Sequence, residues 1–138
     1  MTMAYFWLNQ RSDSVYRSTE GEVYHYRGNI PGSKKLSEGD QFVYYKPSES
    51  TLAGTGTIGS IRKEDNRPDG VGYNVLIEYF ADIVNYRSFD PAVDALDVSN
   101  QVSFLREKEG LRGVPQHSIY KISEDDFYTI LNTAGVVP

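Results

Sequence analysis

The sequence predicts an α+β domain with one curled, partly closed mixed β-sheet and two or three short helices. Short runs rich in aromatic and β-branched residues recur along most of the chain, and turn-forming glycine, proline and aspartate separate them. The clear capping signals for helices occur late in the chain. Its 138 residues match the usual size of one domain, so we expect a single domain over residues 1–138.

Five segments have the composition of strands, and they lie at 4–9, 22–27, 41–45, 54–61 and 73–89. The third follows the turn residues Gly39-Asp40 and ends at a double tyrosine, Tyr44-Tyr45. The fourth carries several glycines, so a hairpin with the third strand would place the tyrosines beside bare backbone. The fifth is long for one strand, and we expect it to bend and to be interrupted near Ala81-Asp82.

Two helices are predicted from their caps. Asp90 is a candidate N-cap with a proline at the first helical position, which predicts a short helix over 91–96. Ser123, followed three residues later by an aspartate, resembles a capping box, and Gly135 is suited to end that helix. A further helical turn is expected within 101–109.

Composition excludes several kinds of site. The chain has no cysteine, which removes disulfides and zinc thiolates, and its start lacks the basic region of a signal peptide. No apolar run approaches the ~18–20 residues that a membrane span needs, so we expect a cytoplasmic protein with no membrane partner. The net charge of −5 gives no general reason to expect non-specific binding to nucleic acid.

Three motifs that carry chemistry elsewhere have structural explanations here. The glycines of 54–59 match G-x-G-x-x-G, but a strand end and a charged loop follow them instead of a helix N-terminus. His25 and His117 are the only histidines, and neither has a second ligand at metal spacing. The acidic run 124–126 is explained by the helix cap. We therefore expect no cofactor, no metal and no catalytic residue.

Aromatic residues are the most informative feature, since they make up 13% of the chain and include 11 tyrosines. Five aromatic residues fall on three predicted strands, namely Trp7, Tyr24, Tyr26, Tyr44 and Tyr45. Arg27, Lys34 and Lys35 follow the second strand closely. Rings that stack on a base beside cations that bind phosphate are the parts of a nucleic-acid pocket, although plain core packing explains the same rings. On the residues alone, both interpretations stay open.

The order of short motifs along the chain resembles a known family. The motifs are a strand with Trp7, then Tyr24-His25-Tyr26, L-x-x-G-D at 36–40, F-V-Y-Y at 42–45 and G-T-I-G-S-I at 56–61. This order resembles the EVE domain of the PUA-like superfamily, and the strand at 73–89, the segment 116–119 and the last helix fit the same layout. The segment 24–29 differs from the arginine- and asparagine-rich loop of bacterial EVE cores. The pattern is similar to EVE-like modules at the N-terminus of modification-dependent restriction enzymes.

The resemblance implies a PUA-like pseudo-barrel and a non-catalytic module that reads a modified base, such as 5-methylcytosine, in double-stranded DNA by flipping it into an aromatic pocket. We expect the pocket to be formed by Trp7, Tyr24, Tyr26, Tyr44 and Tyr45, with Gln116 and Ser118 bonding to the edge of the base. The expected phosphate contacts are Arg27, Lys34, Lys35 and Arg112. Any nuclease activity would lie in another domain, in cis or in trans.

Two other classes of function remain open. A binding module for modified RNA, a small aromatic ligand or a protein partner is the main alternative, and the acidic net charge favours it. An enzyme would need a nucleophile beside a base, and no motif in the sequence supplies that pair.

Overall fold

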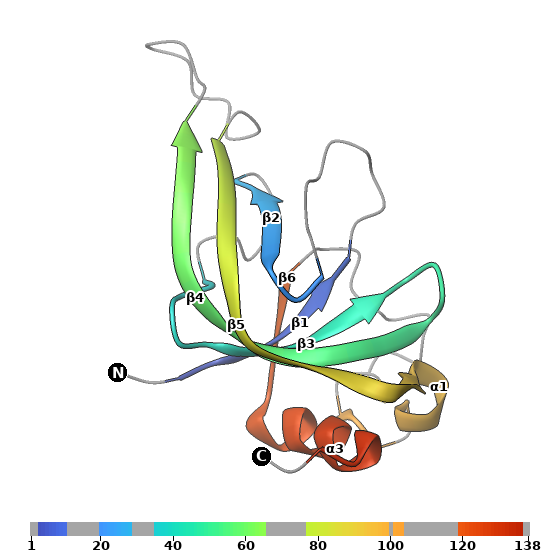
Figure 1. Cartoon of the computed structure of the whole chain (residues 1–138). Coiled ribbons are helices and arrows are strands. Elements are labelled where there is room, and N and C mark those ends of the chain that lie inside the picture. Colours follow the sequence, from blue (N-terminus) through green and yellow to red (C-terminus); the bar gives the residue numbers. More distant parts are fainter. Residues whose placement is uncertain are drawn as a thin grey trace.

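The computed structural model describes residues 3–10, 20–28, 35–65, 77–99, 101–103 and 119–136. Six strands in this part of the chain form one sheet, and two helices lie close together beside it (Figure 1). The strands are β1 (Tyr5–Asn9), β2 (Val23–Arg27), β3 (Gln41–Lys46), β4 (Thr51–Asp65), β5 (Ile77–Asp94) and β6 (Ile119–Ile122). The helices are α1 (Ala95–Val98) and α3 (Glu124–Ala134).

The sheet is mixed, with the strand order β2-β5-β4-β3-β1-β6. β1 runs parallel to β3, and the other neighbours are antiparallel. Because β4 and β5 curl strongly, the sheet closes part of the way into a half-barrel (Figure 1). The predicted fold class, an α+β domain on a partly closed mixed sheet, is confirmed.

The curl of β4 and β5 follows from irregularities in their pairing. Between the pairs Ile58–Ile83 and Ile61–Ala81, β4 has one more residue than β5. Further along, β5 has the extra residue, and Asn85 there has a positive φ of 54°. Such bulges bend a strand and increase its right-handed twist. The predicted interruption of the fifth strand is therefore wrong, because β5 bends but continues through Asp82 to Asp94.

The helix predicted at 91–96 is also wrong for most of its length. Residues 91–94 belong to β5, where Val93 pairs with Leu52 and Asp94 with Thr51 of β4. The helix α1 begins only at Ala95, and its N-cap is Asp94, whose side chain accepts a hydrogen bond from Leu96 N. Pairing with a neighbouring strand outweighs the local capping signal.

The last helix agrees with its predicted caps. Ser123 Oγ accepts from Asp126 N at 3.1 Å, and Gly135 ends α3 with a φ of 74°. The carboxylate of Asp126 accepts hydrogen bonds from Ser103, at 2.8 Å from its N and 2.7 Å from its Oγ. Asp126 therefore ties residues 101–103 to α3, a role that the sequence did not indicate. In the described ranges, no helix is both long enough and apolar enough to cross a membrane.

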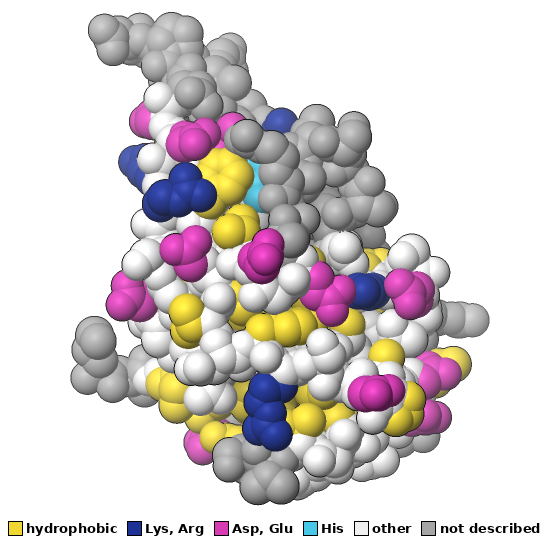
Figure 2. All heavy atoms as spheres, viewed as in Figure 1, with side chains coloured by type: hydrophobic (Ala, Val, Ile, Leu, Met, Phe, Trp, Pro, Cys, Tyr) yellow, Lys and Arg dark blue, Asp and Glu magenta, His cyan; other side chains and the backbone are white. Residues whose placement is uncertain are grey.

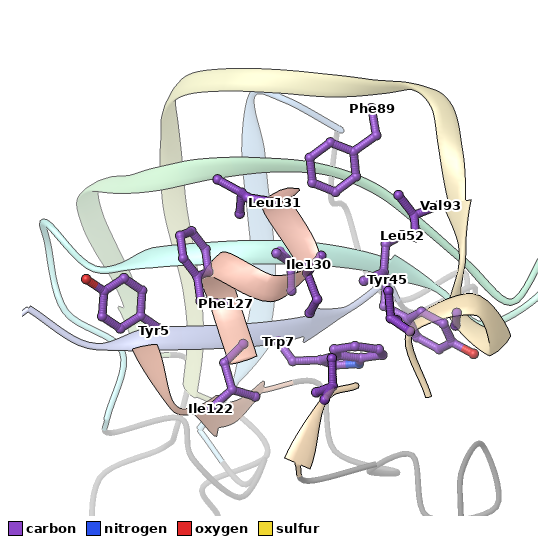
Figure 3. Packing of buried hydrophobic residues seen from close by; sticks show 14 residues of the cluster. Tyr5, Trp7, Tyr45, Leu52, Phe89, Val93, Ile122, Phe127, Ile130 and Leu131 are labelled. Atoms are coloured by element: carbon purple, nitrogen blue, oxygen red, sulfur yellow. The ribbon is translucent and has the colours of Figure 1, made fainter. Parts of the chain in front are cut away.

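Two buried clusters lie on the two faces of the sheet. The helix face holds α3 and the rings of Trp7, Tyr45 and Phe127 (Figure 3). The opposite face, here called the inner face, carries a second cluster. Its members are Phe6, Leu8, Tyr24, Tyr26, Leu36, Phe42, Tyr44, Ala53, Ile58, Ala81, Ile83 and Ile119. Successive residues of a strand point to opposite faces, so β1 and β3, which are apolar at consecutive positions, contribute to both clusters.

Candidate functional site

The sheet divides the five predicted aromatic residues into two groups. Trp7 and Tyr45 lie on the helix face, where their ring centroids are 4.8 Å apart (Figure 3). Tyr24, Tyr26 and Tyr44 lie on the inner face. None of the five is more than 4% exposed. One pocket can therefore contain only one of these groups, and the three tyrosines of the inner face are the larger.

The tyrosines of the inner face form a connected set of rings. Tyr24 contacts Tyr44 edge-on, with centroids 6.2 Å apart, and lies 5.9 Å from Tyr26. Tyr26 in turn stacks on Tyr79 of β5 at 5.1 Å. The hydroxyl of Tyr24 donates to Asn9 O at 2.9 Å. Burial, followed by the charge of Tyr79, raises the pKa of Tyr26 far above its usual value. The raised pKa keeps Tyr26 neutral, and the cluster combines apolar rings with a fixed hydroxyl at Tyr24.

Tyr44 is the exception within this set. Its side chain is 1% exposed, and its hydroxyl has no hydrogen-bond partner among the described residues. Burial, followed by the nearby charge of Glu20, raises the pKa of Tyr44 to about 12. A buried hydroxyl without a partner costs about 1–3 kcal/mol, which makes this group suited to bond to a ligand.

A glycine of β4 lies opposite Tyr44 and creates bare backbone beside it. Gly54 pairs with Tyr44 in the β3–β4 register, and directly opposite residues of an antiparallel pair share a face. A Cβ on Gly54 would lie 2.5 Å from Tyr86 Oη and 2.7 Å from Arg87 O. The expectation that tyrosine stands beside glycine backbone is thus met at Tyr44, but a further tyrosine, Tyr86, covers the glycine.

Tyr86 was not singled out from the sequence. Its ring also lies against Gly21, where a Cβ would approach Cδ2 to 3.0 Å. The only sequence signal was the glycine-rich strand, which predicts close approach of another group but does not say which one. Tyr86 packs at the edge of the inner-face cluster and is partly exposed.

An ion pair holds Tyr86 in place. Glu20 Oε2 accepts from Tyr86 Oη at 2.8 Å, and Glu20 Oε1 lies 2.6 Å from Lys46 Nζ. Burial alone would raise the pKa of Glu20, but the hydrogen bonds from Lys46 and Tyr86 outweigh it and lower the pKa. The hydrogen bond to Glu20 raises the pKa of Lys46. We call Tyr44, Gly54, Tyr86, Glu20 and Lys46 the tyrosine slot.

The predicted phosphate contacts are only partly within the described residues. Arg27 ends β2 and is half-buried, whereas Lys35 is exposed. Lys35 and Lys121 line an open groove of about 450 Å³ together with Glu38 and Asp40. The carboxylate of Asp40 accepts from Ala4 N and Ser37 N, so the backbone already binds it. Lys34, Arg112, Gln116 and Ser118 lie outside the described residues, and their roles stay predictions.

The motifs that we set aside from the sequence have visible structural roles. The glycines of 54–59 lie inside β4, which continues to Asp65. His25 is buried, its Nε2 lies 3.0 Å from Glu78 Oε1, and its ring stacks on Phe80 at 4.5 Å. Among the residues that the structure describes, no three His, Asp or Glu side chains gather in the manner of a metal site.

Comparison with solved structures assigns the fold. A hypothetical protein from Leishmania major superposes with a TM-score of 0.67 at 12% identity, covering 97% of this chain and 96% of that one. The N-terminal domain of McrB from Staphylothermus marinus gives 0.60 at 10% identity, covering 96% and 98%. Human THYN1, solved in complex with DNA containing 5-methylcytosine, gives 0.62 at 12% identity, covering 98% and 99%.

The fold is EVE-like. This agrees with the resemblance seen in the short sequence motifs, and the likeness to the solved structures extends over nearly the whole chain. No family model matches the sequence, and no curated protein matches it either. At identities of 10–12%, the likeness concerns the fold alone, so the chemistry of the EVE-like inner face has to be argued from its own residues.

Proposed function

We propose that this chain is a non-catalytic DNA-binding module that reads a modified base, 5-methylcytosine or a relative of it, after the base has been flipped out of the duplex. The observation that carries the proposal is the hydroxyl of Tyr44, which is buried among tyrosine rings on the inner face and has no hydrogen-bond partner among the described residues. The shared fold supports it, since human THYN1 with that fold has been solved with DNA containing 5-methylcytosine.

Flipping a base has a cost that the inner face can offset. Unstacking and unpairing one base costs a few kcal/mol. Stacking on an aromatic side chain returns roughly 1–3 kcal/mol per base, and the inner-face cluster contains the rings of Tyr24 and Tyr44, which meet edge-on. A methyl group in an apolar pocket adds only ~1 kcal/mol, so discrimination between cytosine and 5-methylcytosine should be modest.

Hydrogen bonds would then fix the base and the backbone. Tyr44 Oη is a donor and an acceptor without a partner among the described residues, so it can bond to the edge of the base. We retain Gln116 and Ser118 as further edge contacts. The proposed phosphate contacts are Arg27, Lys34, Lys35 and Arg112. Lys121 joins this set because it lines the same groove as Lys35.

We further propose that the module is the recognition part of a modification-dependent restriction system in the cytoplasm. The structural likeness to the N-terminal domain of Staphylothermus marinus McrB supports this assignment. A nuclease activity would then be supplied by another domain, in cis or in trans. We propose binding roles for the described site residues and assign no catalytic role to any of them.

The test is fluorescence-polarisation binding to three matched short duplexes, unmodified, with 5-methylcytosine and with N6-methyladenine, at low and at moderate salt. We expect a preference for the 5-methylcytosine duplex that persists when salt is raised, because contacts to the base depend little on counterion release. Equal or absent binding to all three duplexes would contradict DNA reading.

A second candidate is a binding module for modified RNA, a small aromatic ligand or a protein partner. The net charge of −5 favours it, and Figure 2 shows acidic and basic side chains interspersed on one face of the molecule. The slope of log K against log salt separates nucleic acid from the other ligands. Each phosphate contact adds about −0.9 to the slope on duplex DNA and about −0.7 on a single strand, so a flat dependence would favour a small aromatic ligand or a protein partner.

A further inference from the structure

Tyr86 fills a place that the rest of the inner face leaves open. The Cγ–Cδ2 edge of its ring lies against Gly21, and its Cζ–Oη end lies against Gly54, so only main chain lines the ring at these two points. Any other residue at Gly54 would carry a Cβ within 2.6 Å of Tyr86 Cζ. Gly21 and Gly54 thus leave room for the ring of Tyr86, and we call the space that this ring fills the recess.

We propose that Tyr86 occupies the position of the ligand base and must swing out before a base can enter. This inference rests on the proposed function. It adds the residue that blocks the site, Tyr86, and the chemical class of the base. Tyr86 is partly exposed, packs only at the edge of the inner-face cluster and is held by one exposed hydrogen bond, so its side chain can move outward with less loss of packing than the fully buried Tyr24 and Tyr44.

The position of Tyr86 on β5 supports such a movement. Tyr86 follows Asn85, whose φ is 54°, and lies where β5 carries the extra residue between its pairs with Thr55 and Thr57. A bulge leaves its residue out of the regular ladder and redirects its side chain. Tyr86 is therefore absent from the ladder pairs on either side of it, so no directly opposite residue of β4 in the ladder packs against its side chain.

The groups around the recess indicate the class of base. Once Tyr86 has left, the carboxylate of Glu20 loses one donor and can accept from an exocyclic amine, as carboxylates do from cytosine N4. Tyr44 Oη gains a partner on the edge of the base. The O4 carbonyl of thymine at the same place would instead bring a second acceptor against the carboxylate of Glu20. The slot thus favours an aminopyrimidine over thymine, although both bases can carry the 5-methyl group.

When Tyr86 fills the recess, the base cannot enter. The apparent affinity for the base is therefore reduced, because only the fraction of molecules with Tyr86 displaced can bind. Tyr86→Phe keeps the ring but removes the hydrogen bond to Glu20, so we expect it to bind the 5-methylcytosine duplex about two- to fivefold more tightly than wild type. If Tyr86 were a wall or donor for the ligand, the same change would weaken binding. Tyr128→Phe, on α3 and on the helix face, is the matched control that should leave binding unchanged.

A test without DNA separates this inference from the proposed function. NMR titration with free 5-methylcytosine and free thymine would be compared for wild type, Tyr86→Phe and Tyr86→Ala. We expect Tyr86→Ala to bind 5-methylcytosine about tenfold more tightly than wild type, and more tightly than it binds thymine. Circular dichroism verifies folding, and Tyr86→Phe carries the test if the alanine variant does not fold.

The outcomes are distinct. If the Tyr86 variants bind free 5-methylcytosine more tightly than wild type does but no duplex binds, the tyrosine slot is supported and DNA reading is wrong. If neither variant gains affinity for the duplex or for the free base, displacement of Tyr86 is wrong even if wild type prefers modified DNA. Equal binding of thymine and 5-methylcytosine to Tyr86→Ala would contradict the assigned role of Glu20.

Discussion

Tyr44 and Gly54 face each other across the β3–β4 pair, so the buried tyrosine lies opposite backbone without a side chain. Tyr86 covers that backbone from β5 and is held by Glu20. A buried hydroxyl on β3, a glycine on β4, a partly exposed ring on β5 and the carboxylate of Glu20 in a turn thus come together. This arrangement is the basis of the predictions below.

Removing the hydroxyl of Tyr44 should weaken binding of the duplex without lowering the stability of the fold. We expect Tyr44→Phe to leave the free energy of unfolding unchanged or to raise it by about 1 kcal/mol, because the lost group has no described partner. The same variant should bind the 5-methylcytosine duplex about fivefold more weakly. Urea unfolding and fluorescence polarisation measure the two effects.

The matched control is Tyr24→Phe. Its hydroxyl donates to Asn9 O inside the same cluster, so we expect a loss of about 1 kcal/mol in unfolding free energy. Equal destabilisation by both substitutions would show that the Tyr44 hydroxyl has a partner after all.

Gly54→Ala should destabilise the sheet by steric conflict. The new Cβ would lie 2.5 Å from Tyr86 Oη and 2.7 Å from Arg87 O, and the second contact is with main chain that cannot rotate away. Overpacking of this kind costs about 1–3 kcal/mol in unfolding free energy. Adding Tyr86→Ala should restore only part of the loss, since the contact with Arg87 O remains.

The control for Gly54→Ala is Gly135→Ala at the end of α3. There the φ of 74° is unfavourable for alanine, but nothing lies within 4 Å of the new Cβ. We expect a loss of about 1 kcal/mol that Tyr86→Ala does not relieve. Complete rescue of Gly54→Ala by Tyr86→Ala would contradict the contact with the backbone.

The cap of α3 should make a measurable contribution to stability. Ser123 Oγ accepts from Asp126 N, and its loss in Ser123→Ala should lower the unfolding free energy by about 1 kcal/mol. Thermal unfolding followed by circular dichroism measures it. Thr133→Ala, an exposed site on the same helix, is the control with little expected effect. A null result at Ser123 would indicate that packing of Phe127 and Ile130, not the cap, fixes the start of α3.

Alkaline pH should destabilise the protein through its buried tyrosines. Burial and the charge of Glu20 raise the pKa of Tyr44 to about 12, above the value of about 10 for an unfolded chain. The neutral phenol is therefore favoured by folding. Its contribution is complete below pH 10 and is lost as the pH rises from about 10 through 12.

The measurement is the melting temperature of wild type and of Tyr44→Phe between pH 8 and 12. We expect the difference between them to shift in favour of Tyr44→Phe above pH 10, because the variant has no phenol to ionise at this position. A constant difference over the whole range would mean that Tyr44 does not titrate in this window.

Much of the fold was predictable because local patterns coincide with tertiary pairing. The strands β1, β2 and β3 and the helix α3 lie within a residue or two of their expected ranges. The two corrections fall on β5, where a capping signal at Asp90 was outweighed by pairing with β4, and where bulges replaced an interruption. Local propensity cannot register a partner strand that lies some forty residues away along the chain.

The candidate site was less predictable than the fold. Tyr24, Tyr26 and Tyr44 share the inner face, but Trp7 and Tyr45 lie on the helix face, and Tyr86 and Glu20 were not anticipated. The period of two along a strand does show that Tyr44 and Tyr45 point to opposite faces. Which face of each strand meets which face of another depends on the order of strands in the sheet.

The sequence by itself determined the α+β class, the positions of most strands, the capped last helix and the motifs of an EVE-like layout. These features depend on short-range patterns of aromatic, glycine and capping residues. Only the tertiary structure decided that Gly54 lies under Tyr86, that Glu20 holds Tyr86, and that the Tyr44 hydroxyl is left without a described partner. Those relationships join residues that are far apart in the chain, and they arise from the register and bulges of β3, β4 and β5, which no local pattern encodes.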